Sequence, residues 1–358
     1  MTTIATEKHE ARLPLTTWIA LIVVGLGGVA LSWGLQFSKG MGITGLGQQV
    51  VWGLYIAGFF TAMGAGAALV VLAALNEFSS RAPVTNRRNI LLLALASFVV
   101  GALLIAMDVG NPLRLWRILT AGRFTSMMTW DFWMLIVTGI FTLVYLILGW
   151  KQTASTGLTR TFGILALLAA VALVVVEGWM LSTMAARPLW GGGLMVVSFL
   201  VAALVAGLSI AILAWPQAVQ RLGGWLAIGL WVTLAILLIE VLSAVMEKDL
   251  RPYPEVTQLL AGAFSPMFWV YLIGGLLVPL ALLLWKKDSL WLHIAAGLAL
   301  SGVIAEKLWL LAAGQALPWL ALPQGSYLPT LVEVLGVIGS IALCILIYRF
   351  LLRILKAE

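Results

Sequence analysis

Long apolar runs recur along almost the whole chain and are separated by short polar segments. A helix of about 20 such residues, rising about 1.5 Å per residue, spans the hydrocarbon core of a bilayer. Ten runs lie at roughly 15–35, 50–75, 89–107, 130–149, 161–184, 191–214, 224–247, 266–285, 290–313 and 328–352. They are apolar at successive rather than alternate positions, which excludes a transmembrane β-barrel. We therefore expect an all-α integral membrane protein of about ten transmembrane helices.

Composition agrees with this fold class. Of 358 residues, 62% are hydrophobic and 10% are charged, whereas soluble domains carry about 25% charged residues. The first run is too long for a cleaved signal peptide and lacks a small-residue cleavage site, so we expect it to be retained. Residues 15–352 then form a single transmembrane domain between two cytoplasmic tails, 1–14 and 353–358.

Basic residues near the ends of the expected helices predict the orientation. With ten spans, both tails and every second loop share one side, and that side carries most of the lysines and arginines. The positive-inside rule then places both termini in the cytoplasm of a multi-pass protein of a bacterial cytoplasmic membrane. The net charge of +7 is therefore a topology signal, and we expect contact with membrane lipid but not with nucleic acid. The more elaborate outer loops, 108–129, 185–190, 248–265 and 314–327, make the outer face the expected working face.

Six carboxyl groups collect in the outer third of the expected helices. Ionisable groups inside a bilayer are costly and usually functional. The set comprises Asp108, Asp131, Glu177, Glu240, Glu306 and Glu333. The four glutamates are expected about 8–12 Å below the outer boundary. This asymmetry predicts a polar site or a proton-conducting vestibule that opens outward. Pairing with an arginine or a backbone amide is the structural alternative for each of them.

Three further ionisable features are ambiguous. Lys307 follows Glu306 directly, and neighbouring helical side chains point about 100° apart. We therefore expect that the two do not simply pair with one another and that each meets a partner on another helix. Arg187 and Arg251 can pair with carboxylates at the rim of the domain or have a purely structural role. His293 lies near the inner start of its helix, where an interfacial role competes with a role as proton relay.

The second expected helix carries an aromatic stripe. Gln48, Trp52, Tyr55 and Phe59 are expected on one face, beginning at the outer surface. The stripe suits a flat aromatic ligand such as a quinone ring, and an aromatic belt at the membrane boundary explains it nearly as well. Small residues at Gly53, Ala57, Thr61 and Gly64 line another face and predict close helix packing.

Several kinds of redox chemistry are excluded. The two histidines, His9 and His293, cannot provide bis-histidine haem ligation within the membrane. The single cysteine, Cys344, cannot hold an iron–sulfur cluster and is expected to pack. We expect this chain to bind no haem, iron–sulfur cluster or metal. A redox role therefore requires a quinone beside a partner's cluster.

Several stretches resemble the NrfD-like family, the membrane subunits of polysulfide reductase and related complexes. The segment 52–66, WGLYIAGFFTAMGAG, is similar to the family's aromatic, glycine-rich second helix. The segment 108–116 is close to D-x-G-x-P-x-R-x-W, although Asn111 stands where many members have a basic residue. SMMTWD at 126–131 resembles S-x-M-x-W, and RPLW at 187–190 resembles R-P-x-W. YLPT at 327–330, with Glu333, resembles the ten-helix branch, which also serves quinone-linked hydrogenases and alternative complex III.

This resemblance covers about residues 45–345 and implies a function. It implies a menaquinone or ubiquinone site near Gln48, Trp52, Tyr55, Phe59 and Asp108. Asp108 and the nearby Asp131 would exchange protons with the quinone. The glutamates expected to form a proton path are Glu177, Glu240, Glu306 and Glu333.

The expected partners are an iron–sulfur subunit on the periplasmic side and, bound to it, a molybdopterin or other catalytic subunit. The expected arrangement is two four-helix bundles plus two further helices. The chain is thus predicted to be the quinone-binding membrane anchor of a respiratory oxidoreductase. Proton translocation coupled to the quinone reaction is compatible with this role. A proton-coupled secondary transporter is the alternative, although transporters usually bind substrate near the bilayer midplane.

Overall fold

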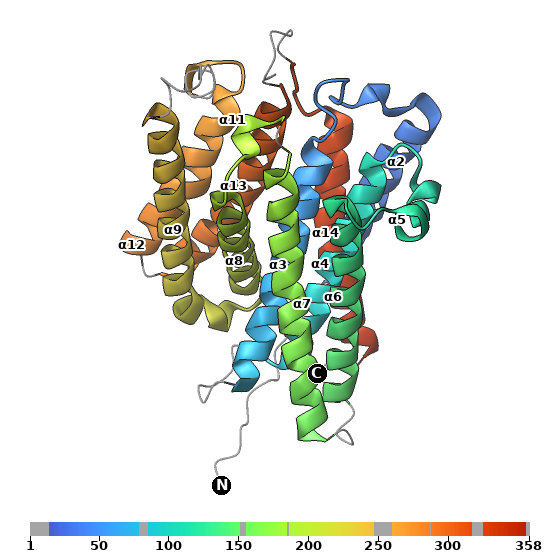
Figure 1. The fold of residues 1–358 in the computed structure, drawn as a ribbon. Coiled ribbons are helices and arrows are strands. Elements are labelled where there is room, and N and C mark those ends of the chain that lie inside the picture. The colour runs from blue at the N-terminus through green and yellow to red at the C-terminus, as the bar shows by residue number, and fades with distance from the viewer. Residues whose placement is uncertain are drawn as a thin grey trace.

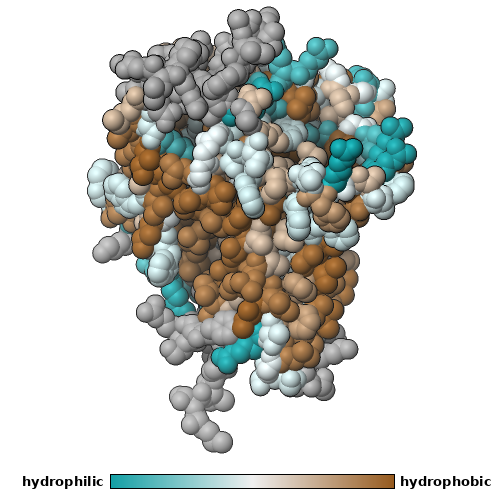
Figure 2. Space-filling model, in the orientation of Figure 1, coloured by the Kyte–Doolittle hydropathy of each residue, from teal (hydrophilic) through white to brown (hydrophobic). Residues whose placement is uncertain are grey.

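The computed structural model describes residues 14–78, 85–150, 155–184, 186–246, 260–286, 288–316 and 325–355. Within these ranges the regular structure is entirely helical. In this described part of the chain, ten helical segments are long and apolar enough to cross a membrane, which confirms the expected number. Figure 2 shows apolar side chains over the middle of the visible face and hydrophilic ones towards its upper and lower ends, as a membrane protein requires.

The ten spans match the apolar runs with boundaries shifted by a few residues. The first comprises α1 (Leu15–Ile22), the π-helical η1 (Val23–Gly27) and α2 (Gly28–Lys39). The eighth comprises α11 (Ser265–Trp269), the π-helical η7 (Val270–Leu277) and α12 (Val278–Trp285). The others are α3 (Leu54–Phe78), α4 (Arg87–Asp108), α6 (Met127–Trp150), α7 (Thr156–Ser182), α8 (Leu194–Ala214), α9 (Val219–Met246), α13 (Ser289–Ala316) and α14 (Leu331–Ile354). Short helices, η3 (Pro112–Arg114) and α5 (Trp116–Ala121), lie between α4 and α6.

Small residues set the closest helix contacts. A methyl group at Gly64 of α3 would lie 3.0 Å from Ala203 Cβ of α8, and both Ala57 and Thr61 are buried. The close packing expected for this face of α3 is therefore confirmed. Gly275 of η7 approaches Gly302 of α13 in the same way, with 2.3 Å between an added methyl group and Gly302 Cα.

The π-helical turn in η7 has a local cause. Pro279 has no backbone N–H, so it cannot donate to the carbonyl four residues earlier, and its ring clashes there in a regular α-helix. That position is Gly275, within η7, so the backbone widens just before the proline.

Helix α3 lies at the centre of the fold and packs against α4, α7, α8 and α13. Helix α8 packs against α9 and α13, and α13 against η7. Helix α14 packs against α2 and α4. Figure 1 shows α9, α12, α13 and α8 towards the left and α4, α6, α7 and α2 towards the right. The division into two four-helix bundles and two further helices remains a prediction. We call the end of the domain where α4 ends and α14 begins the Asp108 end.

Candidate functional site

The hydroxyl group of Tyr55 lies at the centre of a buried polar cluster where α2, α3 and α14 meet. Gln36 Nε2 donates to this hydroxyl at 2.5 Å, and Ser32 Oγ lies 2.8 Å from it. Ser32 also donates to the carbonyl of Val332 at 2.9 Å, which ties α2 to the start of α14. Gly336 leaves room for this junction, because a methyl group there would lie 2.8 Å from both Ser32 Oγ and Tyr55 Cε1.

Asp108, the last residue of α4, stands beside this cluster. Its carboxyl group is within electrostatic range of Tyr55 and of Glu333. Asp108 Oδ1 and Gln36 Oε1 are both buried, with no hydrogen-bond partner among the described residues. Leaving a buried acceptor unpaired costs about 1–3 kcal/mol, so such atoms mark a place where a bound molecule can complete the bonding. We call Ser32, Gln36, Tyr55 and Asp108 the Tyr55 cluster.

Glu333 next to this cluster is fully buried and clamps three chain segments. Its Oε1 accepts from the Tyr327 hydroxyl at 2.7 Å, and the same hydroxyl accepts from the Leu54 amide at 2.8 Å. Its Oε2 accepts from the Gly45 amide at 2.8 Å and from Thr330, forming a capping box at the start of α14. Burial and the neighbouring Glu333 raise the pKa of Tyr327, so its hydroxyl stays a donor. These contacts match the structural role that the sequence left open for Glu333.

The aromatic stripe is the first expectation that the structure corrects. Helix α3 begins at Leu54, so Gln48 and Trp52 lie in the segment before it, and Gln48 is exposed. The backbone before α3 is held instead by the buried Gln315 side chain, which accepts from the Trp52 amide at 3.0 Å and donates to the Trp52 carbonyl at 2.8 Å. The side chain of Trp52 stacks on Trp190 with 5.9 Å between ring centroids. Of the expected stripe, Tyr55 and Phe59 alone share a face of α3, and both are buried.

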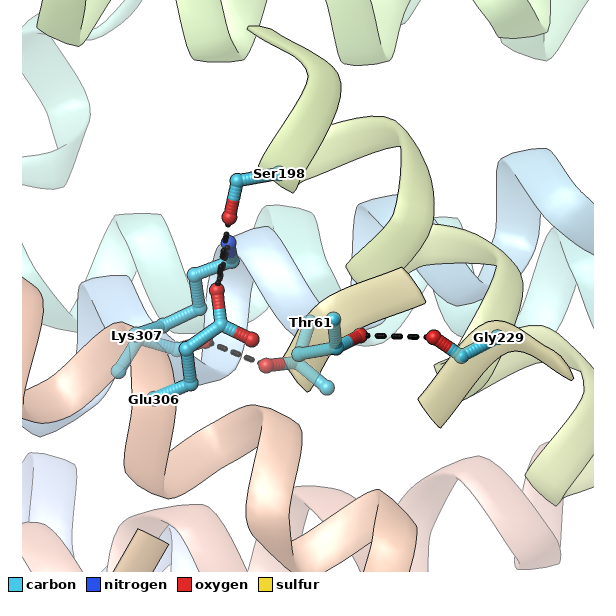
Figure 3. A network of polar contacts seen from close by, with 7 residues as sticks. Thr61, Ser198, Gly229, Glu306 and Lys307 are labelled. Atoms are coloured by element: carbon cyan, nitrogen blue, oxygen red, sulfur yellow. Dashed lines mark hydrogen bonds and ion pairs between the residues drawn. The ribbon is translucent and has the colours of Figure 1, made fainter. Parts of the chain in front are cut away.

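A second group of ionisable side chains centres on Lys307 of α13. Its Nζ lies 2.9 Å from Glu306 Oε1, so the expectation that these neighbours do not pair with each other is wrong. Neighbouring side chains leave the helix about 100° apart, but the four-carbon side chain of lysine is long enough to bend back towards the adjacent residue. Both also meet α8, as expected, since Ser198 Oγ donates to Glu306 Oε1 at 3.3 Å and Lys307 Nζ lies 3.6 Å from the centroid of the Phe199 ring. Figure 3 shows Ser198 pointing at this pair.

Two carboxyl groups flank the pair from α6 and α7. Glu177 is fully buried, and neither of its oxygens has a hydrogen-bond partner among the described residues. Asp131 and Lys307 both lie within electrostatic range of Glu177. Asp131 is 4% exposed and lies one turn inside α6 rather than at its end, because that helix begins at Met127.

On the other side of the pair, a small cavity lies between α8, α9, η7 and α13. The cavity is large enough for about one water molecule, whose centre can lie anywhere within about 20 Å³. Its polar lining comprises Ser198, Thr233, Glu240, Tyr271, Glu306 and Trp309. Glu240 lies within electrostatic range of Glu306 and Lys307, so the cavity extends the same ionisable group. We call Asp131, Glu177, Glu240, Glu306 and Lys307 the Lys307 cluster.

The common depth expected for the four glutamates is also corrected. Glu306 lies ten residues before the end of α13, a depth of about 15 Å, whereas Glu333 lies two residues after the start of α14, about 3 Å. Glu177 and Glu240 lie about 8 and 9 Å from the ends of their helices. Helix α13 continues beyond its apolar run because Gln315 is buried against the segment before α3.

The remaining predicted residues have structural surroundings. Arg187 donates to the Gln315 carbonyl and, among the described residues, to no carboxylate, and Arg251 lies outside the described residues. His293 Nδ1 lies 2.6 Å from the Ser289 carbonyl in the first turn of α13, which fits an interfacial role. Cys344 Sγ lies 3.9 Å from Ser97 Oγ, between α14 and α4. Among the described residues, no group of three His, Cys, Asp or Glu side chains could hold a metal ion.

Sequence reasoning missed Ser32 and Gln36. They stand four residues apart where the first apolar run ends, so they share one helix face, and two polar residues on one face of a membrane span were the available signal. It also missed Tyr271 and Ser198, which carry no signal in the sequence because their importance depends on which helix lies opposite.

Comparison with known proteins shows to which family the chain belongs. A protein of Halobacterium salinarum, named as a putative membrane subunit of dimethyl sulfoxide reductase, is 28% identical, over 94% of this chain and 89% of the relative. The Hdr-like menaquinol oxidoreductase integral membrane subunit of Archaeoglobus fulgidus is 27% identical, over 86% and 85%. A selenate reductase subunit of Mesobacillus selenatarsenatis is 22% identical, over 84% and 81%. The family model described as polysulphide reductase, NrfD, matches residues 42–318, most of the chain, and this protein therefore belongs to the NrfD polysulphide reductase family.

Proposed function

We propose that this chain is the quinone-binding membrane subunit of a multi-subunit oxidoreductase in the bacterial cytoplasmic membrane. It would exchange electrons between the quinone pool and an iron–sulfur subunit. Family membership and three relatives named as subunits of reductase or oxidoreductase complexes support this role. One of these relatives is named for menaquinol, which favours menaquinone over ubiquinone.

The observation that carries the proposal is the pair of unpaired buried acceptors in the Tyr55 cluster. A quinol hydroxyl is a donor, and Asp108 Oδ1 and Gln36 Oε1 can accept from it. The side chains of Met107 and Tyr55 lie beside these acceptors, close to Gly336. The cluster lies at the ends of α2, α3 and α4, close to where a partner outside the membrane can dock.

Within this site the residues of the chain have separate tasks. Bound quinol would supply two electrons and two protons. Asp108 accepts a hydrogen bond and then a proton, because it is the carboxylate of this cluster and has a buried, unpaired oxygen. Ser32 and Gln36 fix the position of the Tyr55 hydroxyl. Asp131 and the glutamates of the Lys307 cluster form the proposed proton path.

The partner is proposed at the Asp108 end, on the periplasmic side. An iron–sulfur subunit docked there would have its cluster near the Tyr55 cluster, and a molybdopterin or other catalytic subunit would bind to it. Gentle purification of the tagged chain from its native membrane, with identification of co-purifying proteins and extraction of bound quinone, tests this directly. Recovery of the chain alone, under conditions that keep other membrane complexes intact, would sink the anchor proposal.

Asp108→Asn tests the site. The amide keeps the size of the side chain and cannot take up a proton, so we expect quinol-linked turnover to fall at least tenfold while partner subunits still co-purify. Asp288→Asn is the matched control, because Asp288 is exposed and lies before α13, away from the Asp108 end. Turnover of Asp108→Asn equal to that of the control would remove Asp108 from the mechanism.

A further inference from the structure

Lys307 is buried in the interior, with 2% of its side chain exposed. An ammonium group has three N–H donors, and among the described residues Glu306 is its hydrogen-bond acceptor. The Phe199 ring, 3.6 Å away, provides a cation–π contact. A ring face attracts a cation without taking its proton, so the lysine is held in place while most of its donors stay free.

A second carboxyl group faces the same lysine from another helix. Glu177 of α7 lies within electrostatic range of Lys307, and neither of its oxygens has a partner among the described residues. Helix α7 meets α8 closely here, because a methyl group at Gly178 would lie 2.8 Å from Val196 Cα and 3.2 Å from Phe199 Cβ. Phe199 therefore contacts the backbone beside Glu177 as well as the ammonium group.

The charges of the Lys307 cluster do not balance. It has four carboxyl groups, Asp131, Glu177, Glu240 and Glu306, but one ammonium group. Transfer of a charge from water to a protein interior costs several kcal/mol unless the charge is paired. One lysine can balance one carboxylate, and each further carboxyl group avoids this cost by holding a proton. The position of Lys307 and the position of the protons are therefore linked.

We propose that Lys307 is a proton carrier that links Glu177 to Glu306 and so joins the carboxyl groups of α6 and α7 to the cavity at Glu240. This extends the proposed proton path and rests on it. The ammonium group gives a proton to the Glu306 carboxylate, which leaves a neutral amine and a neutral carboxyl group. The neutral amine, no longer held by an ion pair, then turns to the Glu177 carboxyl group and takes its proton, which restores the ammonium group. The net result is one proton moved from Glu177 to Glu306.

The surroundings of the pair fit both ends of this transfer. Asp131 lies within electrostatic range of Glu177 and can refill it with a proton. On the other side Glu306 lines the cavity together with Glu240 and Tyr271, and the room for about one water allows a bridged transfer between the two glutamates. Tyr271 lies within electrostatic range of both glutamates.

The test uses the whole complex, purified with its partner subunits and reconstituted in lipid vesicles. The rate of proton release during quinol oxidation is measured with a pH-sensitive dye and a short-chain quinol analogue. Lys307→Gln removes the proton carrier, and Lys307→Arg keeps a positive charge that cannot be released as a proton. We expect both variants to release protons at least tenfold more slowly, while Lys286→Gln, at an exposed lysine, keeps the wild-type rate.

The arginine variant distinguishes a proton carrier from a structural ion pair, because it keeps the charge but cannot release a proton. It can also be measured if the glutamine variant does not assemble. A wild-type rate of proton release in Lys307→Arg would show a structural ion pair and overturn the proposal. A second measurement does not need quinone: transfer to heavy water shifts the infrared band of buried protonated carboxyl groups. We expect at least one such band to shift tenfold more slowly in Lys307→Arg, and equal rates would overturn the carrier. Absence of quinol turnover in the wild-type complex would instead count against the proposed function.

Discussion

Glu333 offers the sharpest test of how the ends of the helices are held together. Its carboxylate accepts hydrogen bonds from the Tyr327 hydroxyl, the Gly45 amide and both donors of Thr330, at 2.7 to 3.1 Å. Hydrogen bonds to charged groups contribute about 1.5–3 kcal/mol each, but they are not additive. Removing the carboxylate leaves these buried neutral donors without an acceptor, at about 1–3 kcal/mol each. We therefore expect Glu333→Ala to lower the free energy of unfolding by about 3–5 kcal/mol.

Glu333→Gln is the informative comparison. Its amide oxygen can still accept from Gly45 and Thr330, and its NH₂ group can donate to the Tyr327 hydroxyl, so we expect a loss of about 1 kcal/mol. Apparent free energies are measured by unfolding the protein in mixed micelles with increasing amounts of a denaturing detergent. An alanine variant within about 1 kcal/mol of wild type, or a glutamine variant as unstable as alanine, would refute the clamp. A stable glutamine variant with slowed proton release would instead support the sequence-based assignment of Glu333 to the proton path.

Two more predictions follow from single contacts. Gly275→Ala should lower the free energy of unfolding by about 1–3 kcal/mol, because its methyl group would lie 2.3 Å from Gly302 Cα, whereas Gly274→Ala, with open space, should be near neutral. Equal effects in the same detergent titration would show that η7 and α13 can move apart at little cost. The raised pKa of Tyr327 means that the folded protein holds this proton more tightly than the unfolded chain, so its contribution is complete below pH 10.0, the ordinary value, and is lost as pH rises further. Tyr327→Phe should flatten this alkaline decline in stability, and parallel pH profiles would contradict the assignment.

The sequence by itself determined the fold class and the number of spans. Each run of about 20 apolar residues must satisfy its own backbone hydrogen bonds within the bilayer, which leaves a helix as the solution for that run alone. The sequence also identified the ionisable residues that are costly to place in a membrane, from Asp108 to Glu333. A charged residue within an apolar run can be recognised without knowing which helix packs against it. The motif beginning at Asp108 also indicated the family that the comparison confirmed.

The first residue of α3 could not be predicted from the local sequence. The apolar run predicts a helix through Trp52, but Gln315 bonds the Trp52 backbone from α13, so the helix begins at Leu54. No pattern within the run contains this information, because the residue that decides it is more than 260 positions away.

Tertiary structure alone decided which buried polar groups meet. It joined Ser32 and Gln36 of the first span to Tyr55, and it placed Glu177 opposite Lys307 across two helices. A membrane span can satisfy its backbone by itself, so its length and apolar character are fixed locally. A buried side chain finds its partners on other helices, and their choice depends on packing between segments far apart in the chain.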